Sequence, residues 1–359
     1  MPLTSALMRV CLISLCVHGA VHAQTEAPAE AEQNKSRAEL WDEGTERQRA
    51  WADEFLGDTR EMGMALLVIP TINLDAQGPR NFDDPSVRAD FVRQRSMKMR
   101  WLHHVNEHNA ISVGYGKHKR EAWDTGPLFQ MTDGAITYQM IAVQPGRYRL
   151  ARITYIQPGM REPAPHDKPT SLSLDKAGVA VLNEFDMKDY RKTGHWSQAM
   201  KRDDGMGTGC PLVLRVGDGC TEEAREFRWG MSARSAVKGG VAEVIEIPAI
   251  DAELTFSPVA EITLAEGDVV LTDGFVLPAD QPKLAEDTCQ VLANDLMCSL
   301  DTLTVERLPA SLKSFRQATG LKAYGMTKTE AALRNLVYRA PKIHAKPVPG
   351  ASPNLLRVE

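Results

Sequence analysis

The sequence of 359 residues lacks the features that usually identify a nucleic-acid-binding protein, a membrane protein or a common hydrolase. Its formal net charge is −5, so it has no excess of Lys and Arg that would indicate nucleic acid as the main partner. It contains no G-x-S-x-G motif, no C-x-x-C pair and no internal repeat. After residue 23, no segment is apolar over the roughly 20 residues that a transmembrane helix needs. We therefore expect no nucleic acid, no transmembrane segment and no cofactor.

The first 23 residues have the pattern of a cleavable secretory signal peptide. Arg9 precedes an apolar run, Val10–Val17, and Val21 and Ala23 occupy the −3 and −1 positions of a cleavage site. The apolar run is too short to span a bilayer. We expect cleavage after Ala23, a mature chain that begins at Gln24, and a location in the periplasm or outside the cell.

Six cysteines occur in the sequence, and two of them, Cys11 and Cys16, lie in the signal region. Lipid attachment there is an alternative to simple cleavage, although Leu15 stands where a lipid-attachment site has Gly or Ala. The other four form two close pairs, and an even number in an exported protein indicates disulfides. Four cysteines allow three pairings, and a metal or redox site is a further alternative. The pairing that we expect closes two short rings and links Cys210 to Cys220 and Cys289 to Cys298.

Composition and turn signals divide the chain into five segments. We expect a signal peptide (1–23), an acidic linker and helix (24–60), a β-sandwich domain (61–285), a disulfide-containing helical appendage (286–345) and a disordered tail (346–359). The N-terminal helix is predicted over 36–56, and the appendage is predicted to contain helices over 305–318 and 327–339. Residues 75–90 are rich in Asp, Gly and Pro and are predicted to form a loop.

Short apolar segments separated by Gly and Pro turns predict several β-hairpins. Strands over 97–101 and 110–115 form one of them, and strands over 136–143 and 148–156 form a second around Pro145 and Gly146. A third joins 260–264 to 269–271. The predicted fold is therefore mainly β, an antiparallel β-sandwich with an N-terminal helix and a small helical C-terminal appendage. Its core is predicted to contain Met97, Ile111, Ile141, Tyr148, Ile153, Val244, Ile262 and Val270.

Two of these turns resemble segments of known exported proteins. The segment 143–150, VQPGRYRL, resembles the PG-x-Y-x-L turn of secreted bacterial β-sandwich domains, including carboxypeptidase regulatory-like modules. The segment 262–275 is similar to a strand–turn–strand unit found in exported bacterial proteins of unknown function. The resemblance covers about a tenth of the chain. It implies a sandwich and no particular activity.

One segment, His104–His108, matches the H-x-x-E-H pattern of inverzincin metallopeptidases. On a helix, His104 and His108 would share a metal ion and Glu107 would act as general base. Glu184 follows at about the separation of the third ligand in the pitrilysin-like peptidases that this motif resembles. The alternation at 97–101 instead predicts a strand, in which residues four apart are about 13 Å apart. We therefore expect the end of a polar hairpin.

These observations favour an exported envelope or periplasmic β-sandwich protein that binds or scaffolds another component. The expected partner is an envelope protein or a cell-surface component. A metal-dependent hydrolase that uses the His104–His108 segment is the second hypothesis. An accessory module of an envelope transport or assembly system is the third. No catalytic residue is assigned.

Overall fold

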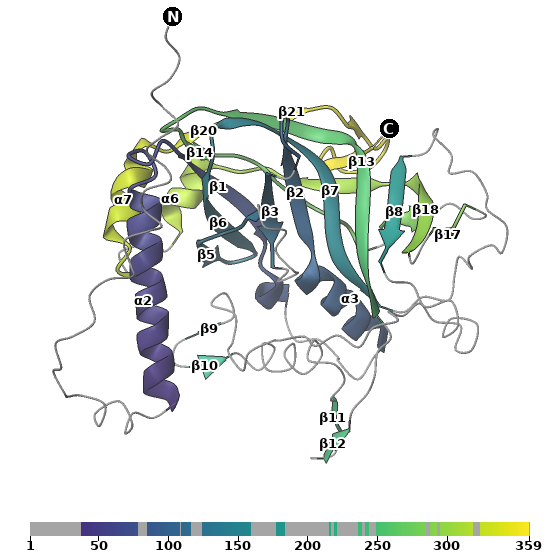
Figure 1. Cartoon of the computed structure of the whole chain (residues 1–359), viewed down its shortest axis with the longest axis horizontal. Coiled ribbons are helices and arrows are strands. Elements are labelled where there is room, and N and C mark those ends of the chain that lie inside the picture. Colours follow the sequence, from purple (N-terminus) through teal and green to yellow (C-terminus); the bar gives the residue numbers. More distant parts are fainter. Residues whose placement is uncertain are drawn as a thin grey trace, which may run out of the picture. The chain divides into compact units, whose positions relative to one another are not determined.

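Figure 1 shows the chain as a computed structural model, which describes residues 37–77, 85–107, 109–115, 124–158, 177–183, 215–216, 219–220, 236–238, 241–243, 249–279, 281–284, 288–292, 295–318 and 324–358. The chain divides into two units, Met1–Glu46 and Arg47–Glu359. Helix α2 (Arg37–Gly57) lies within one residue of its predicted bounds at each end. The described residues are mainly β, as predicted. The signal region and its cleavage site lie outside them.

The strands of the second unit form two principal sheets and smaller ones. In the order of their pairing, the large sheet contains β16 (Lys283–Leu284), β18 (Asp295–Thr302), β8 (Gly178–Leu182), β13 (Ala249–Leu264), β7 (Gly146–Pro158), β2 (Lys98–His103), β3 (Ala110–Gly114) and β4 (Asp124–Thr125), with β17 (Gln290–Leu292) on β18 and β21 (Lys342–Ile343) on β13. The second sheet contains β20 (Val337–Tyr338), β14 (Val269–Leu271), β1 (Ala65–Ile72), β6 (Ile136–Val143) and β5 (Phe129–Asp133). The third contains β15 (Gly274–Val276), β19 (Thr304–Leu308), β23 (Leu355–Arg357) and β22 (Lys346–Pro347). Two short pairs are formed by β9 (Arg215–Val216) with β10 (Gly219–Cys220) and by β11 (Ala236–Lys238) with β12 (Val241–Glu243).

The large sheet and the second sheet pack face to face as a sandwich. The same hydrophobic cluster contains Leu67 and Ile69 of β1 together with Trp101 of β2 and Ile153 of β7. Seven of the eight predicted core residues belong to this cluster, and the eighth, Val244, lies outside the described residues. The alternation of apolar side chains therefore identified the sandwich core correctly.

The second sheet is covered on both faces, which makes it the middle layer of this unit. Leu66 and Val68 point away from the sandwich core and pack in another cluster with Leu56 of α2 and Phe315. Helices α2, α6 (Leu312–Gln317), α7 (Thr327–Ala332) and the 3-10 turn η4 (Leu333–Asn335) supply that cover. A strand that is buried on both faces needs a continuous apolar run, as residues 65–69 show.

Two of the three predicted hairpins are wrong in their pairing, although their strands are present. β6 pairs with β1 and β5 in the second sheet, whereas β7 pairs with β13 and β2 in the large sheet. Likewise β13 belongs to the large sheet and β14 pairs with β1 in the second. Both turns carry the chain from one sheet to the other. The predicted hairpin of β2 and β3 is confirmed. Parallel pairs, such as β1 with β14, also make the sheets mixed rather than purely antiparallel.

The predicted segments after residue 285 need correction. β18 is a strand of the large sheet, so residues 286–345 are not a separate helical appendage, although they contain α6 and α7. β19 occupies the start of the helix predicted over 305–318, because Pro309 cannot lie inside a helix. The tail 346–359, predicted to be disordered, contributes β22 and β23, and β23 pairs with β19.

One segment near the N-terminus differs from the prediction, and another agrees with it. Helix α2 ends at Gly57, close to the predicted end of the acidic linker and helix at residue 60, and the second half of α2 packs in the core of the second unit. The loop predicted over 75–90 contains the 3-10 turn η1 (Leu74–Gln77) and the first turns of helix α3 (Pro85–Ser96). Pro85 at the first position of α3 is a helix-start signal as well as a loop signal.

Candidate functional site: a pocket beside a bulge in the large sheet

The pairing of three neighbouring strands breaks at the same level of the large sheet. Between β2 and β7 the register shifts between Arg100 and Trp101, so that Ala151 is left without a partner on β2. Between β7 and β13 the register shifts between Thr255 and Ala260, and residues 256–259 form a bulge opposite Ala151. Bulges are common beside binding and active sites because they redirect side chains out of the sheet.

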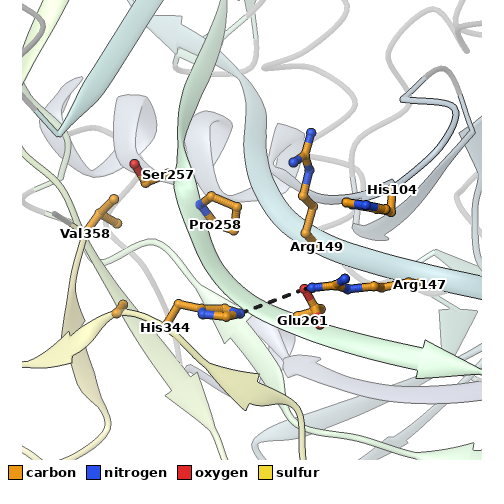
Figure 2. Close-up of a pocket in the computed structure, with 9 residues that line it drawn as sticks. His104, Arg147, Arg149, Ser257, Pro258, Glu261, His344 and Val358 are labelled. Atoms are coloured by element: carbon orange, nitrogen blue, oxygen red, sulfur yellow. Dashed lines mark hydrogen bonds and ion pairs between the residues drawn. The ribbon is translucent and has the colours of Figure 1, made fainter.

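A pocket of about 370 Å³ opens beside this bulge, and Figure 2 shows the side chains around it. Its walls come from the start of β7, the bulge of β13, the turn after β2 and two C-terminal segments. The lining residues are His104, Arg147, Arg149, Ser257, Pro258, Glu261, His344, Ala345 and Val358. The size lies within the range of small-molecule sites in proteins.

The charged side of the pocket follows from the alternation of β7 and β13. Tyr148 and Leu150 point into the sandwich core, so Arg147 and Arg149 point to the outer face of the large sheet. Glu261 lies between two basic side chains in Figure 2, since its Oε2 is 2.5 Å from Arg147 Nη2 and 4.0 Å from His344 Nε2. The hydrogen bond from Arg147 holds the pKa of Glu261 below its ordinary value.

The second arginine is also paired with a carboxylate, which comes from the turn after β2. Arg149 Nη2 donates to Glu107 Oε1. The Nε of Arg149 is buried and, within the part of the chain that the structure describes, has no hydrogen-bond partner. Each arginine therefore gives one nitrogen to a glutamate and retains further donors, because a guanidinium has five N–H groups.

The turn that carries His104 and Glu107 is held by its neighbour His103. His103 Nδ1 accepts hydrogen bonds from the backbone N–H of Val105 at 3.3 Å and of Asn106 at 3.2 Å. Its ring packs edge-on against Tyr148, with ring centroids 5.1 Å apart. His104 N donates to the carbonyl of Arg147 at 2.8 Å. These contacts fix the turn against the start of β7.

The corner between β6 and β7 is held by a buried tyrosine. The Tyr148 hydroxyl donates to the carbonyl of Gln144 at 2.8 Å, four residues upstream. Burial raises the pKa of Tyr148 to about 12, so the hydroxyl stays protonated and remains a donor at neutral pH. The contact resembles the tyrosine corner of β-sandwich domains. The PG-x-Y-x-L residues therefore build the corner, and the variable positions between them supply the two pocket arginines.

On the other side, the pocket is bounded by the bulge and by C-terminal segments. Pro258 suits the bulge because it has no N–H to offer a neighbouring strand. The carbonyl of Val259 accepts hydrogen bonds from the N–H of His344 at 2.8 Å and of Ala345 at 3.3 Å. Val358 is buried, and its N–H donates to the carbonyl of Leu303. This wall is apolar except for Ser257 and His344.

No family model, curated protein or solved structure matches this chain. The resemblance of its turns to exported sandwich domains therefore stays a prediction.

The residues of the predicted metal site are only partly described. The strand predicted at 97–101 is present as β2, and the chain turns at His104–Glu107. His104 lines the pocket, whereas Glu107 is paired with Arg149. His108 and Glu184 lie outside the described residues, so the predicted set of four ligands remains untested. Among the residues that the structure describes, no group of three or more His, Cys, Asp or Glu side chains is arranged to hold a metal ion.

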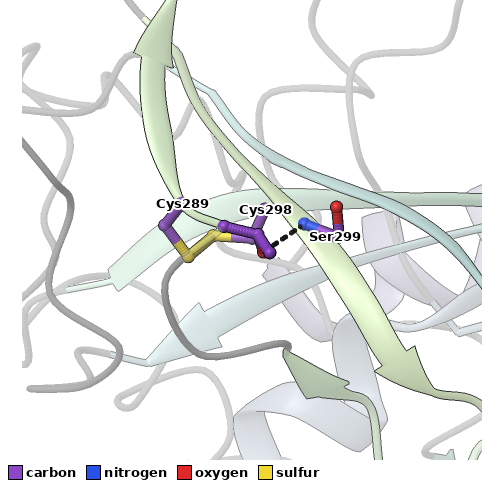
Figure 3. Close-up of a disulfide and its surroundings, with 4 residues drawn as sticks. Cys289, Cys298 and Ser299 are labelled. Atoms are coloured by element: carbon purple, nitrogen blue, oxygen red, sulfur yellow. Dashed lines mark hydrogen bonds between the residues drawn. A yellow bond between two sulfur atoms is a disulfide. The ribbon is translucent and has the colours of Figure 1, made fainter. Parts of the chain in front are cut away.

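One of the two predicted disulfides is confirmed. Figure 3 shows the bond between Cys289 and Cys298 beside Ser299. Both cysteines are completely buried. They lie opposite each other because β17 and β18 pair Gln290 with Met297. The other predicted pair stays a prediction, since Cys210 and the side chain of Cys220 lie outside the described part.

Sequence reasoning missed four of the charged pocket residues: Arg147, Arg149, Glu261 and His344. The alternation of Tyr148 and Leu150 could have assigned the two arginines to the outer face. Nothing in the sequence indicated that Glu261 and His344 would meet them, because that meeting depends on the bulge and on the placement of the segment after β21.

Proposed function

We propose that this chain is an exported cell-envelope protein that binds an envelope component or a small ligand in the pocket beside the β13 bulge. The observation that carries the proposal is the coincidence of the register breaks in β2, β7 and β13 with a pocket lined by paired charges. A break in two adjacent pairings bends the strands and redirects side chains, and such bulges are over-represented next to active sites as well as at sheet edges.

Two features support export. The N-terminal 23 residues have the pattern of a signal peptide. The buried Cys289–Cys298 bridge is of the kind that persists in oxidising compartments. In the part of the chain that the structure describes, none of the helices has the length and apolar content needed to cross a membrane.

Export is tested by fractionating bacterial cells that express the full chain and measuring the intact mass of the product. We expect periplasmic protein that begins at Gln24. Protein that retains Met1 and stays in the cytoplasm would contradict this half of the proposal.

Binding is tested by thermal unfolding in the presence of a compound panel that contains acids, amines, neutral sugars and short peptides. A ligand that binds only the folded state raises the melting temperature. We expect at least one compound to do so, and Ser257→Trp, which fills the pocket from an exposed position, to abolish the rise. Val105→Ala is the matched control, because Val105 is 86% exposed on the turn beside His104. A panel without any stabilising compound, or a shift that Ser257→Trp retains, would contradict the pocket as binding site.

A further inference from the structure

We infer that the pocket takes a carboxylate carried on an apolar body, with Arg147 and Arg149 as the groups that hold the carboxylate. The inference rests on the proposed binding function and names its ligand class. The carboxylate can belong to a free small acid or to the C-terminus of a peptide, and the two sources share the same recognition chemistry.

The free N–H donors of the lining favour an acceptor such as a carboxylate. The pocket wall contains two guanidiniums and the carboxylate of Glu261, and the carboxylate of Glu107 is paired with Arg149, so two glutamates balance the two arginines before either histidine is counted. Each arginine keeps N–H donors beyond the one that it gives to its glutamate, because a guanidinium has five. Both arginines approach the pocket from alternate positions of one strand, β7. Guanidinium groups bind planar oxyanions through two parallel N–H donors, which gives orientation as well as attraction.

The two ion pairs within the chain show that both arginines can bind a carboxylate at the pocket. Arg147 already holds Glu261, and Arg149 already holds Glu107. Both pairs are partly exposed: the side chain of Arg147 is 48% exposed and that of Glu107 is 52% exposed. Pairs in such positions are weak and exchange with solvent, so a ligand carboxylate can share or replace the glutamate.

The opposite wall favours an apolar body. Pro258, Ala345 and Val358 present only carbon atoms of their side chains, and they face the pocket from the bulge and the C-terminal segments. An anion alone would leave this wall in contact with water. A ligand with an alkyl or aryl group beside its carboxylate removes apolar surface from water on this side.

The test compares four ligands by isothermal titration calorimetry on the mature protein. Hexanoate, hexanol and hexylammonium each have six carbon atoms and differ in charge, and acetate has the charge of hexanoate without its alkyl chain. We expect hexanoate to bind at least about tenfold more tightly than hexanol and hexylammonium, because only hexanoate gains a charge-assisted hydrogen bond to an arginine. It should bind at least about tenfold more tightly than acetate, because its alkyl chain is removed from water. Acetyl-alanyl-leucine is compared with hexanoate, and its C-terminal amide is the control for the carboxylate. Tighter binding of the peptide acid indicates a peptide terminus as the natural source, and tighter binding of hexanoate indicates a free acid.

Substitutions of Arg147 and Glu261 should change the affinity for hexanoate in opposite directions. If the two residues only stabilised the fold, both substitutions would weaken binding. Arg147→Gln should weaken hexanoate binding at least about tenfold. Glu261→Gln should strengthen it about two- to fivefold, because it removes the carboxylate that competes for Arg147. Glu54→Gln is the matched control: it removes one negative charge from α2, whose layer covers the opposite face of the second sheet, and should change nothing.

The outcomes separate the ligand class from the proposed function. If hexanol or hexylammonium binds as tightly as hexanoate and Ser257→Trp abolishes that binding, the carboxylate inference is wrong and the pocket remains a binding site. If no panel compound binds in a manner sensitive to Ser257→Trp, the proposed function itself fails. Weaker binding in Glu261→Gln would also overturn the inference.

Discussion

At the scale of single residues, Gly146 is needed because His103 lies against its backbone. A methyl group at position 146 would overlap the Nε2 end of the His103 ring. The ring cannot move freely, since its Nδ1 holds the turn that presents His104 and Glu107. Gly146→Ala should therefore lower the free energy of unfolding by about 1–2 kcal/mol, measured by urea denaturation.

The His103 contact is isolated by a double-mutant cycle. In a His103→Ala background the overlap is gone, so the added effect of Gly146→Ala should fall by at least about 0.5 kcal/mol. An equal effect of Gly146→Ala in both backgrounds would show that His103 is not the cause.

The charged residues of the site illustrate how far sequence reasoning reaches at this scale. His104 and Glu107 attract notice as part of a motif, although the structure gives them roles different from those in a metallopeptidase. Arg147 and Arg149 lie in a segment whose turn can be recognised from the sequence. The sequence indicates only that their side chains point to the outer face of the sheet. Glu261 and His344 could not be assigned, because the contact between positions 83 residues apart is created by the bulge and by β21.

At the scale of elements, β15 crosses β1 at very close range. The Cβ of any side chain at Gly274 would overlap the backbone carbonyl oxygen of Pro70, which lies in β1 and cannot move aside as a side chain can. Gly274→Ala should therefore lower the free energy of unfolding by about 3 kcal/mol.

A second glycine provides the comparison for this substitution. A Cβ at Gly126 would meet nothing within 4 Å, so Gly126→Ala should stay within about 0.5 kcal/mol of the parent protein. Equal urea midpoints for the two variants would contradict the close crossing of β15 and β1.

The wrong hairpins have a physical explanation at the same scale. The strands that flank Pro145–Gly146 would show the same alternation of apolar and polar side chains in either arrangement. They could pair with each other in one sheet, or they could lie in two sheets that face each other across a core. The informative signal in the sequence was the continuous apolar run Met140–Val143 at the end of β6, where both faces of the strand are buried. Such a run is typical of a strand in a middle layer, which cannot be part of a simple two-layer hairpin.

At the scale of the whole molecule, contacts between segments distant in the sequence determine how helices are capped and where terminal strands pair. The local sequence pattern does not predict these contacts. The N-terminus of α7 is capped by Asp53 of α2, which accepts from the N–H groups of Lys328 and Thr329 at 3.2 and 2.8 Å. Local sequence could predict that a helix begins near Thr327, but not that its cap lies 275 residues away. The C-terminal strand β23 is fixed in the same way, by pairing with β19.

The central claim is that the pocket beside the β13 bulge is the binding site and that its two arginines hold the ligand. The most direct test is the ¹⁵N–¹H NMR spectrum of the arginine Nε–Hε groups during a titration with hexanoate. We expect the Arg147 and Arg149 signals, assigned through Arg147→Lys and Arg149→Lys, to shift together and saturate with one dissociation constant. Arg307, which is held by the buried Asp273, should not shift. Unchanged Arg147 and Arg149 signals, or an equal shift at Arg307, would contradict the account.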